Sequence, residues 1–329
     1  MIGCRIQVVL SRQVDKPSAC FLMRSDVADE VYGPRERSAA ARLAAITDNV
    51  AEAEVILASW GCPVMDAGFL DKAPRLRLVL YAAGSVRAFV TDALWDKGIR
   101  VSGAHALNAI SVAEYSLAVI LFSLKHGWQD VRDPLGSRSG IPGTFGATVG
   151  LVSLGAVGRL VRKMLRPHQL KVLAYDPFVT AEEARRLDVH AVDLDQLFRV
   201  SDVVSLHAPL LPDTRGMVTG AHIESMRPGA TLINTARGAI VREAELAAVL
   251  ERRPDLQAVL DVTDPEPPRS GSPLLTLRNV VLTPHIAGAI GPERRRLGKG
   301  MVEELRRYVR REPLRWEMNR EQVQRMATP

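Results

Sequence analysis

The chain has 329 residues, 47% of them hydrophobic and 24% charged, which excludes wholesale disorder and leaves room for two ordinary domains. The 43 Lys and Arg outnumber the 37 Asp and Glu, which hints at acidic small molecules or nucleic acid. The arginines are scattered or lie on predicted helices, and we find no zinc-finger spacing or RNP-like motif, so no nucleic-acid partner is expected.

The first hundred residues alternate between short β-rich runs and stretches suited to helices. This alternation predicts a parallel sheet with crossover helices. The predicted strands are Arg5–Leu10, Glu54–Ser59, Leu76–Ala82 and Ile99–Ser102.

A helix is predicted after these strands. Ser111 and Glu114 have the spacing of a capping box, in which a Ser caps the helix and a Glu three residues later bonds back. The next residues, Tyr115–Lys125, are apolar on nearly every side, so we expect this helix to be buried between two bodies.

A second alternating series follows, with six short and strongly apolar runs. Such runs suit strands that are covered on both faces, as in a doubly wound nucleotide-binding sheet. The runs are Thr148–Val152, Lys171–Tyr175, Val203–Leu206, Thr231–Asn234, Ala258–Asp261 and Val280–Thr283. The stretch Pro292–Arg311 is predicted to be helical.

The turn after Thr148–Val152 carries a dinucleotide fingerprint in which Ser153 replaces the first Gly. Gly155 lets the backbone approach a pyrophosphate, and Gly158 lets the helix pack close to its strand. Ala156 and Val157 stand at the helix N-terminus, whose free N–H groups favour phosphates. The alternative is a plain helix-start turn that binds no ligand.

Asp176 lies at the end of the next strand, 18 residues after Gly158 (176 − 158). A carboxylate there can accept a hydrogen bond from the ribose 2′-OH of NAD, and it would repel the 2′-phosphate of NADP. We therefore predict NAD as the cofactor.

Three polar residues, Arg237, Glu266 and His285, follow apolar strands at the edge where such sheets bind ligands. Reduction of a 2-oxo acid needs a cation for the carboxylate, a proton donor for the developing alkoxide, and a carboxylate that keeps the donor charged. The three residues can supply these roles. Alternatively, Arg237 could be a salt-bridge partner, Glu266 a solvated loop acid and His285 a strand cap. Spacing alone does not single out these three residues.

Six ordered segments together closely resemble the D-isomer-specific 2-hydroxyacid dehydrogenases. The resemblance is strong over about residues 102–300 and weaker over the first hundred. The segments are Val149–Gly158, Tyr175–Pro177, His207–Leu210, Asn234–Gly238, Leu260–Pro267 and Thr283–Gly288.

The resemblance implies roles for individual residues. Arg237 would bind the substrate, Glu266 would support the acid/base and His285 would be the acid/base. Asp261 would contact the nicotinamide amide, His207 and Pro209 would form the wall near the adenine, and Thr214 would touch the phosphates. The full implied cofactor set is Gly155, Ala156, Val157, Gly158, Asp176, His207, Pro209, Thr214, Thr235, Ala236, Asp261, His285 and Gly288.

The implied architecture is α/β, with two doubly wound parallel sheets in two domains. A Rossmann NAD-binding domain of residues 109–288 would be inserted into a flavodoxin-like substrate domain of residues 1–108 and 289–329. The family resemblance also suggests a homodimer formed through the NAD-binding domains.

The expected substrate loop departs from the family pattern, since Ala82–Arg87 stands where many members have a Gly-Val-Asp-like sequence. The backbone N–H groups of Gly84, Ser85 and Val86 could still hold a carboxylate. Trp60 could overhang the substrate as an aromatic wall or could simply pack. Two residues of the predicted buried helix, Asn108 and Val112, could line the nicotinamide side or serve as core or capping residues.

The expected function is NAD-dependent hydride transfer between a small 2-oxo acid and its D-2-hydroxy acid, mainly as reduction. Formate and phosphite dehydrogenases resemble this family with an altered acid/base pair, so the intact pair of Glu266 and His285 argues against that alternative. NAD(H)-sensing corepressors resemble the family and keep the triad, so the residues leave that alternative open.

Three features of the sequence indicate the cellular compartment: the cysteines, the N-terminus and the length of the apolar runs. Cys4, Cys20 and Cys62 are too few and too scattered for a disulfide framework or a metal site, and they fit a reducing compartment. The first residues lack the pattern of a signal peptide, and no stretch reaches the roughly 18 uninterrupted apolar residues of a membrane span. We expect a cytoplasmic protein with no metal and no membrane partner.

Overall fold

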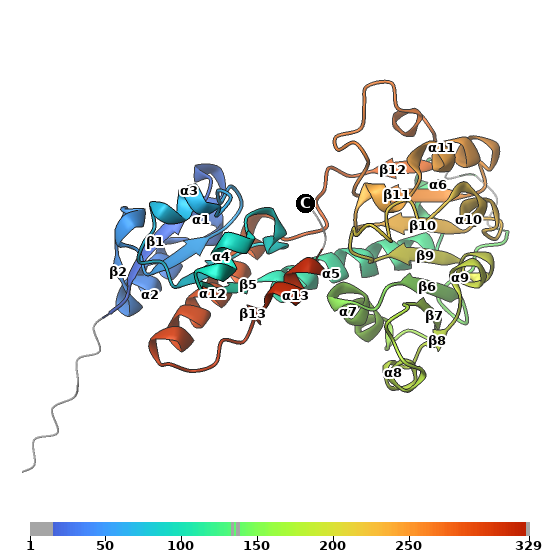
Figure 1. The fold of residues 1–329 in the computed structure, drawn as a ribbon. Helices are drawn as coiled ribbons and strands as arrows, with labels where there is room; N and C mark the ends of the chain where they lie inside the picture. The colour runs from blue at the N-terminus through green and yellow to red at the C-terminus, as the bar shows by residue number, and fades with distance from the viewer. Residues whose placement is uncertain (1–15, 133–134, 136–138, 327–329) are drawn as a thin grey trace, which may run out of the picture.

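A computed structural model gives the fold and describes residues 16–132, 135 and 139–326. Two sheets occupy separate lobes, and a long helix runs from one lobe to the other (Figure 1). The predicted strand Arg5–Leu10 lies outside the described residues.

The first sheet has six strands in the order β2-β1-β3-β4-β5-β13. Its first five strands are parallel and follow the flavodoxin-like order 2-1-3-4-5, whereas β13 pairs with β5 in antiparallel fashion. The strands are β1 (Ser18–Leu22), β2 (Ala45–Ile46), β3 (Val55–Ala58), β4 (Leu78–Tyr81), β5 (Arg100–Gly103) and β13 (Glu317–Met318). Strands β1, β2 and β13 are not predicted by the sequence patterns.

The second sheet has seven parallel strands in the order β12-β11-β10-β9-β6-β7-β8. This is the doubly wound order 3-2-1-4-5-6 with β12 added at one edge. The strands are β6 (Thr148–Val152), β7 (Lys171–Tyr175), β8 (His190–Ala191), β9 (Val203–Leu206), β10 (Thr231–Asn234), β11 (Gln257–Leu260) and β12 (Val280–Leu282). Every apolar run predicted in this half forms a strand, and only the two-residue β8 was missed.

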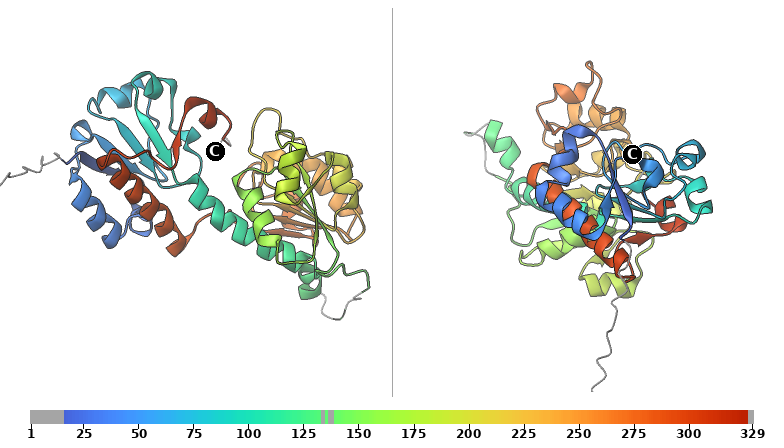
Figure 2. Two further views of the ribbon diagram at one scale, coloured as in Figure 1. Left: turned by 90° about the horizontal axis from the view of Figure 1, so that it is seen from below. Right: turned by 90° about the vertical axis from the view of Figure 1, so that its left-hand side faces the viewer.

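Helices cover both faces of each sheet because the strand side chains are apolar on both sides. In β3, Val55 and Leu57 face one core while Ile56 and Ala58 face the other. On the first sheet, α1, α2 and α12 cover one face, and α3, α4 and α13 cover the other (Figure 2). On the second sheet, α5, α7 and α8 lie opposite α9, α10 and α11.

The helices of the first lobe are α1 (Ser25–Val31), α2 (Pro34–Leu43), α3 (Ala67–Asp71), α4 (Asp92–Asp96), α12 (Arg294–Val309) and α13 (Arg320–Gln324). Those of the second lobe are α5 (His105–Ser123), α6 (Gly127–Arg132), α7 (Ala156–Leu165), α8 (Ala181–Leu187), α9 (Leu194–Val200), α10 (Gly220–Glu224) and α11 (Glu243–Arg252).

The predicted start of the long helix is wrong. Helix α5 begins at His105, directly after β5, so Ser111 is a buried residue inside the helix. Glu114 pairs with Arg296 of α12 at 3.8 Å, and the apparent capping box is a coincidence of spacing. The early start carries α5 from one lobe into the other (Figure 2).

Helix α5 is also long and apolar enough to cross a membrane by length and composition. Seven of its residues are buried, and it packs against α7, β9 and β10. These contacts are those of a core helix, which passes the same test.

Candidate functional site

The turn between β6 and α7 has the shape that the fingerprint predicts. A Cβ added to Gly158 would lie 2.1 Å from the Ser153 carbonyl oxygen, so only glycine fits there. At Gly155 an added Cβ would meet only the Ser153 Oγ, at 3.9 Å, so the turn is open on that side. Gly155 caps α7 without a side-chain hydrogen bond, which leaves the N–H groups of the first turn for a phosphate.

Asp176 follows β7 and lies beside this turn. Its Oδ2 accepts hydrogen bonds from the Leu154 N–H at 2.7 Å and from the Ser153 hydroxyl at 3.3 Å, and its Oδ1 accepts one from the Phe178 N–H at 2.9 Å. The carboxylate is therefore fixed at the edge of the sheet where a ribose would bind.

His207 follows β9 and borders the same turn. A Cβ on Gly158 would lie 3.8 Å from the His207 Cβ. The imidazole is buried, and neither ring nitrogen has a hydrogen-bond partner among the described residues. Burial lowers the pKa of His207 to about 4, so the ring is neutral at pH 7. The open turn, the free helix end and this unpartnered ring together fit a bound dinucleotide.

The other predicted cofactor residues lie at the same sheet edge, but several of their polar groups already bond to the protein. The Thr214 hydroxyl donates to the Pro209 carbonyl oxygen at 2.6 Å and accepts from the Leu211 N–H at 2.8 Å. The Thr235 hydroxyl lies 3.2 Å from that of Ser116 on α5. A phosphate contact by Thr214 remains a prediction, and the structure shows its hydroxyl shaping the loop.

Glu266 and His285 lie together. The His285 Nδ1 is 2.6 Å from the Glu266 Oε1, and their side chains are 47% and 39% exposed, so a substrate can reach them. Because Nδ1 is used by the glutamate, Nε2 is the nitrogen left for proton transfer. Arg237 follows β10, and its charge interacts with that of Glu266. Burial lowers the pKa of Arg237, which nevertheless remains a cation at neutral pH.

Asp261 holds the turn that carries His285. Its buried carboxylate accepts hydrogen bonds from the Thr283 hydroxyl at 2.6 Å and from the N–H groups of Ile286 and Ala287, both at 2.8 Å. The Tyr115 hydroxyl lies 3.0 Å from that of Thr283. Sequence reasoning missed this positioning role, although Thr283 is part of the His285 segment. A nicotinamide contact by Asp261 stays a prediction.

Asn108 on α5 lies between the predicted substrate loop and the chain's return to the first lobe. Its Oδ1 accepts a hydrogen bond from the Ala289 N–H at 3.0 Å, and its side-chain amide is near Gly84 and Gly288. The side chain therefore connects the two segments that link the lobes, a role that the sequence patterns do not predict for Asn108.

The remaining substrate candidates follow strands of the first sheet. Ser85 begins a short turn, and its hydroxyl accepts from the Arg87 N–H at 3.3 Å, while the Val86 side chain is buried. The Trp60 ring lies under the guanidinium of Arg294, 5.2 Å from ring centroid to Cζ, and packs against the core. The described contacts of Trp60 thus favour the packing role.

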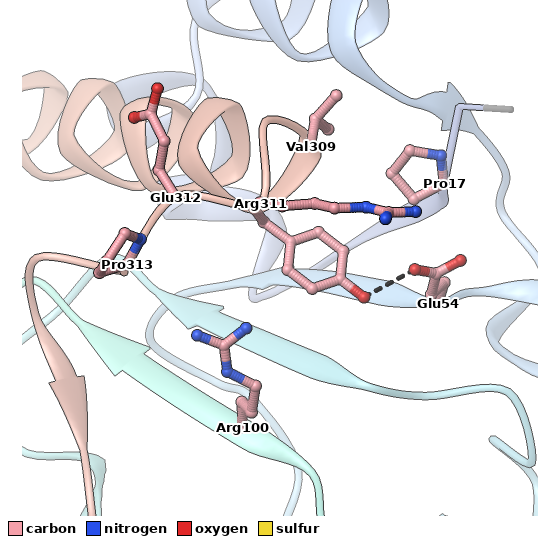
Figure 3. Close-up of a pocket in the computed structure, with 8 residues that line it drawn as sticks. Pro17, Glu54, Arg100, Val309, Arg311, Glu312 and Pro313 are labelled. Atoms are coloured by element: carbon pink, nitrogen blue, oxygen red, sulfur yellow. Dashed lines mark hydrogen bonds between the residues drawn. The ribbon is translucent and has the colours of Figure 1, made fainter. Parts of the chain in front are cut away.

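A cavity of about 540 Å³ (Figure 3) is lined by none of these residues. Its Glu54 directly precedes β3 and its Arg100 begins β5, so it lies where strands start, at the edge opposite to the predicted site. The Tyr308 hydroxyl donates to Glu54 there at 2.7 Å. The cavity is lined by Pro17, Glu54, Arg100, Tyr308, Val309, Arg311, Glu312 and Pro313. This cavity contains none of the groups suited to hydride transfer, which lie at the opposite edge of the sheets.

Comparison with known proteins gives a consistent result. Residues 123–287 match the model described as D-isomer specific 2-hydroxyacid dehydrogenase, NAD binding domain. The chain is 34% identical over 260 residues to D-3-phosphoglycerate dehydrogenase of Archaeoglobus fulgidus, covering 78% of this chain and 49% of that one. It is 35% identical over 251 residues to (S)-sulfolactate dehydrogenase of Chromohalobacter salexigens, covering 74% and 81%. The chain spans about half the length of the phosphoglycerate dehydrogenases it matches.

Among solved structures, the holo form of D-mandelate dehydrogenase from Rhodotorula graminis aligns with a TM-score of 0.76. The sequence identity is 21%, and the alignment covers 93% of this chain and 98% of that one. This likeness confirms the predicted α/β fold with two sheets, and the matched NAD-binding domain confirms the predicted cofactor.

Proposed function

The chain belongs to the D-isomer-specific 2-hydroxyacid dehydrogenase family of NAD-dependent oxidoreductases, and from that premise we propose that it reduces a small 2-oxo acid to the D-2-hydroxy acid. The observation that carries this proposal is the 2.6 Å contact between His285 Nδ1 and Glu266 Oε1. The charge of Arg237 interacts with that of the same glutamate. These groups supply the proton donor, its supporting carboxylate and the substrate cation at the edge of the NAD-binding sheet.

In the proposed reaction, Arg237 binds the substrate carboxylate and polarises the C2 carbonyl. Bound NADH supplies the hydride that C2 accepts. The His285 Nε2 donates a proton to the carbonyl oxygen, so that hydride and proton together yield the alcohol. Glu266 fixes the imidazole through Nδ1 and stabilises its cationic form. Oxidation of the hydroxy acid is the same path reversed.

The proposed cofactor site consists of the turn Gly155–Gly158, with Asp176 for the ribose and His207 with Pro209 near the adenine. Thr214, Thr235, Ala236, Asp261 and Gly288 complete it. The first-turn N–H groups of α7 and the unpartnered ring of His207 support this assignment.

The proposed substrate domain contains residues 1–108 and 289–329, and the proposed cofactor domain contains residues 109–288. Strand membership supports the division, because β13 joins the sheet of β1–β5. Backbone N–H groups of Gly84–Val86 would hold the substrate from the first lobe, and closure of the lobes would exclude water. A homodimer through the cofactor domains and a cytoplasmic location complete the proposal.

The test is NADH consumption by the purified full chain with a panel of 2-oxo acids. The panel contains pyruvate, hydroxypyruvate, phenylglyoxylate, 3-phosphohydroxypyruvate and 3-sulfopyruvate, which differ in the group on C2 or C3. We expect turnover with at least one acid, and a loss of about 10²–10⁴-fold in kcat for His285→Ala with NADH binding retained. His190→Ala is the matched control, because His190 is exposed on the edge strand β8 and is not one of the proposed site residues.

Two outcomes would contradict the proposal. Tight NADH binding without turnover of any acid would favour an NAD(H)-sensing protein. Reduction of NAD by formate or phosphite, with no reaction of 2-oxo acids, would assign the chain to the other dehydrogenase type.

A further inference from the structure

Ser153 has an unusual backbone conformation at the centre of the fingerprint. Its φ angle is +76°, in the left-handed region that glycine enters freely and serine rarely adopts. Its N–H donates to the Tyr175 carbonyl oxygen at 2.8 Å, and its own carbonyl oxygen lies against Gly158. The main chain of Ser153 is therefore fixed between β7 and α7.

The Ser153 side chain points at the residue proposed to select NAD. Its hydroxyl donates to the Asp176 Oδ2 at 3.3 Å, the same oxygen that accepts the Leu154 N–H at 2.7 Å. The Phe178 N–H occupies one acceptor position on Oδ1 at 2.9 Å. A carboxylate has about four acceptor positions, so three protein donors leave one for a ligand.

A ribose presents two neighbouring hydroxyl groups, and the carboxylate can serve both only if one protein donor withdraws. Leu154 and Phe178 donate from the backbone and cannot turn away without moving the loops that carry them. The Ser153 hydroxyl can rotate about its side-chain bond, and its hydrogen bond is the longest of the three. Ser153 is thus the donor that competes with the ribose.

We propose that Ser153 is a positioning residue that weakens NAD(H) binding, because its hydroxyl occupies the Asp176 acceptor that the second ribose hydroxyl needs. This inference rests on the proposed ribose-binding role of Asp176. Selection against NADP is unchanged, because the charge of Asp176 does not depend on Ser153. The replacement of the first glycine therefore sets cofactor affinity without changing cofactor identity.

The test uses Ser153→Ala and Ser153→Gly, with NADH binding measured by fluorescence titration of the full chain. Both variants lack the hydroxyl, and Ser153→Gly also accommodates the positive φ. We expect both to bind NADH about three- to tenfold more tightly than the wild type, the size of one modest hydrogen bond. The KM for NADH falls accordingly and kcat stays within about twofold.

A double-mutant cycle with Asp176→Ala separates this competition from a general effect on the turn. In the Asp176→Ala background, Ser153→Ala should change NADH affinity by less than about twofold, because no acceptor remains to compete for. Thermal unfolding midpoints check that each variant is folded.

Unchanged or weaker NADH binding in both single variants would overturn the inference, and so would an equal gain in the Asp176→Ala background. Failure of the proposed function looks different: the wild type would bind NADH and turn over no 2-oxo acid, while the titrations would still decide the role of Ser153.

Discussion

The Nδ1 atom of His285 lies 2.6 Å from the Oε1 atom of Glu266, although the two residues follow different strands. Glu266 follows β11 and His285 follows β12, which are neighbouring parallel strands. The turn at His285 has a φ of +53° and is held by Asp261, which accepts three hydrogen bonds around it. The parallel pairing of two strands and one buried carboxylate thus place the two side chains together.

Glu266→Gln tests the charge of this pair while keeping its shape. The amide oxygen can still accept from Nδ1, but it no longer stabilises an imidazolium. We expect kcat to fall about 10–100-fold while NADH affinity is kept, measured by steady-state kinetics and NADH titration. Glu251→Gln, on the exposed end of α11, is the control. Full activity in Glu266→Gln would show that the carboxylate charge is not needed.

Arg237→Lys tests the two-pronged binding of the substrate carboxylate. Lysine keeps the charge but loses the planar fork, so we expect kcat/KM for the oxo acid to fall about 10²-fold or more. NADH binding should be unchanged within about twofold. Arg199→Lys, an exposed change on α9, provides the comparison. If Arg237→Lys changed NADH affinity and left oxo acid kinetics intact, Arg237 would belong to the cofactor site.

Asp176→Ala tests cofactor selection. Removing the carboxylate removes its repulsion of a 2′-phosphate and one acceptor for the ribose. We expect the ratio of kcat/KM for NADH to that for NADPH to fall at least about tenfold, mainly through a higher KM for NADH. A ratio equal to that of the wild type would remove Asp176 from the ribose site.

The lowered pKa of the buried His207 should reduce the free energy of unfolding in acid. The pKa of His207 is about 4 in the folded chain and about 6.5 in the unfolded chain. Between these two pH values the imidazole is mostly protonated in the unfolded chain and mostly neutral in the folded chain. The contribution of His207 to the free energy of unfolding is therefore complete above pH 6.5 and decreases as the pH falls toward 4. Between pH 7 and 4.5 the loss is about 2–3 kcal/mol.

The check is urea unfolding of the wild type and His207→Asn at pH 7 and pH 4.5. The variant lacks the titrating ring and should lose about 2–3 kcal/mol less than the wild type over this interval. Equal losses in both proteins would mean that the buried ring is protonated without cost. His190→Asn, exposed on β8, should behave as the wild type does.

The second sheet could be predicted almost strand by strand because its runs are apolar on both faces and turns separate them clearly. Strand β13 could not be predicted, since a two-residue strand is defined by its pairing with β5, more than 200 residues away in sequence (317 − 103 = 214). The start of α5 could not be predicted, because the local capping pattern at Ser111 carries no information about the packing that extends the helix to His105.

The site residues, like the strands, include some that the sequence predicts and some that it does not. Gly155, Gly158 and Asp176 are predicted by the physical needs of a dinucleotide turn, whereas the family resemblance is what singles out Arg237, Glu266 and His285. The contact between Ser153 and Asp176 depends on a positive φ, and the role of Asp261 depends on hydrogen bonds to a turn. Neither of these is encoded in a residue pattern.

Helix α12 has a consequence for synthesis of the chain. It covers one face of the first sheet with Leu297, Met301 and Leu305, yet about 190 residues separate its start from the end of β5 (294 − 103 = 191). At a synthesis rate of about 5–20 residues per second, the part of that face that α12 covers stays exposed for roughly 10–40 s, although α1 and α2 already pack on the same face. The second sheet is continuous in sequence and completes itself during this interval. During this interval the nascent first lobe presents uncovered apolar surface, which is the kind of surface that favours aggregation during folding.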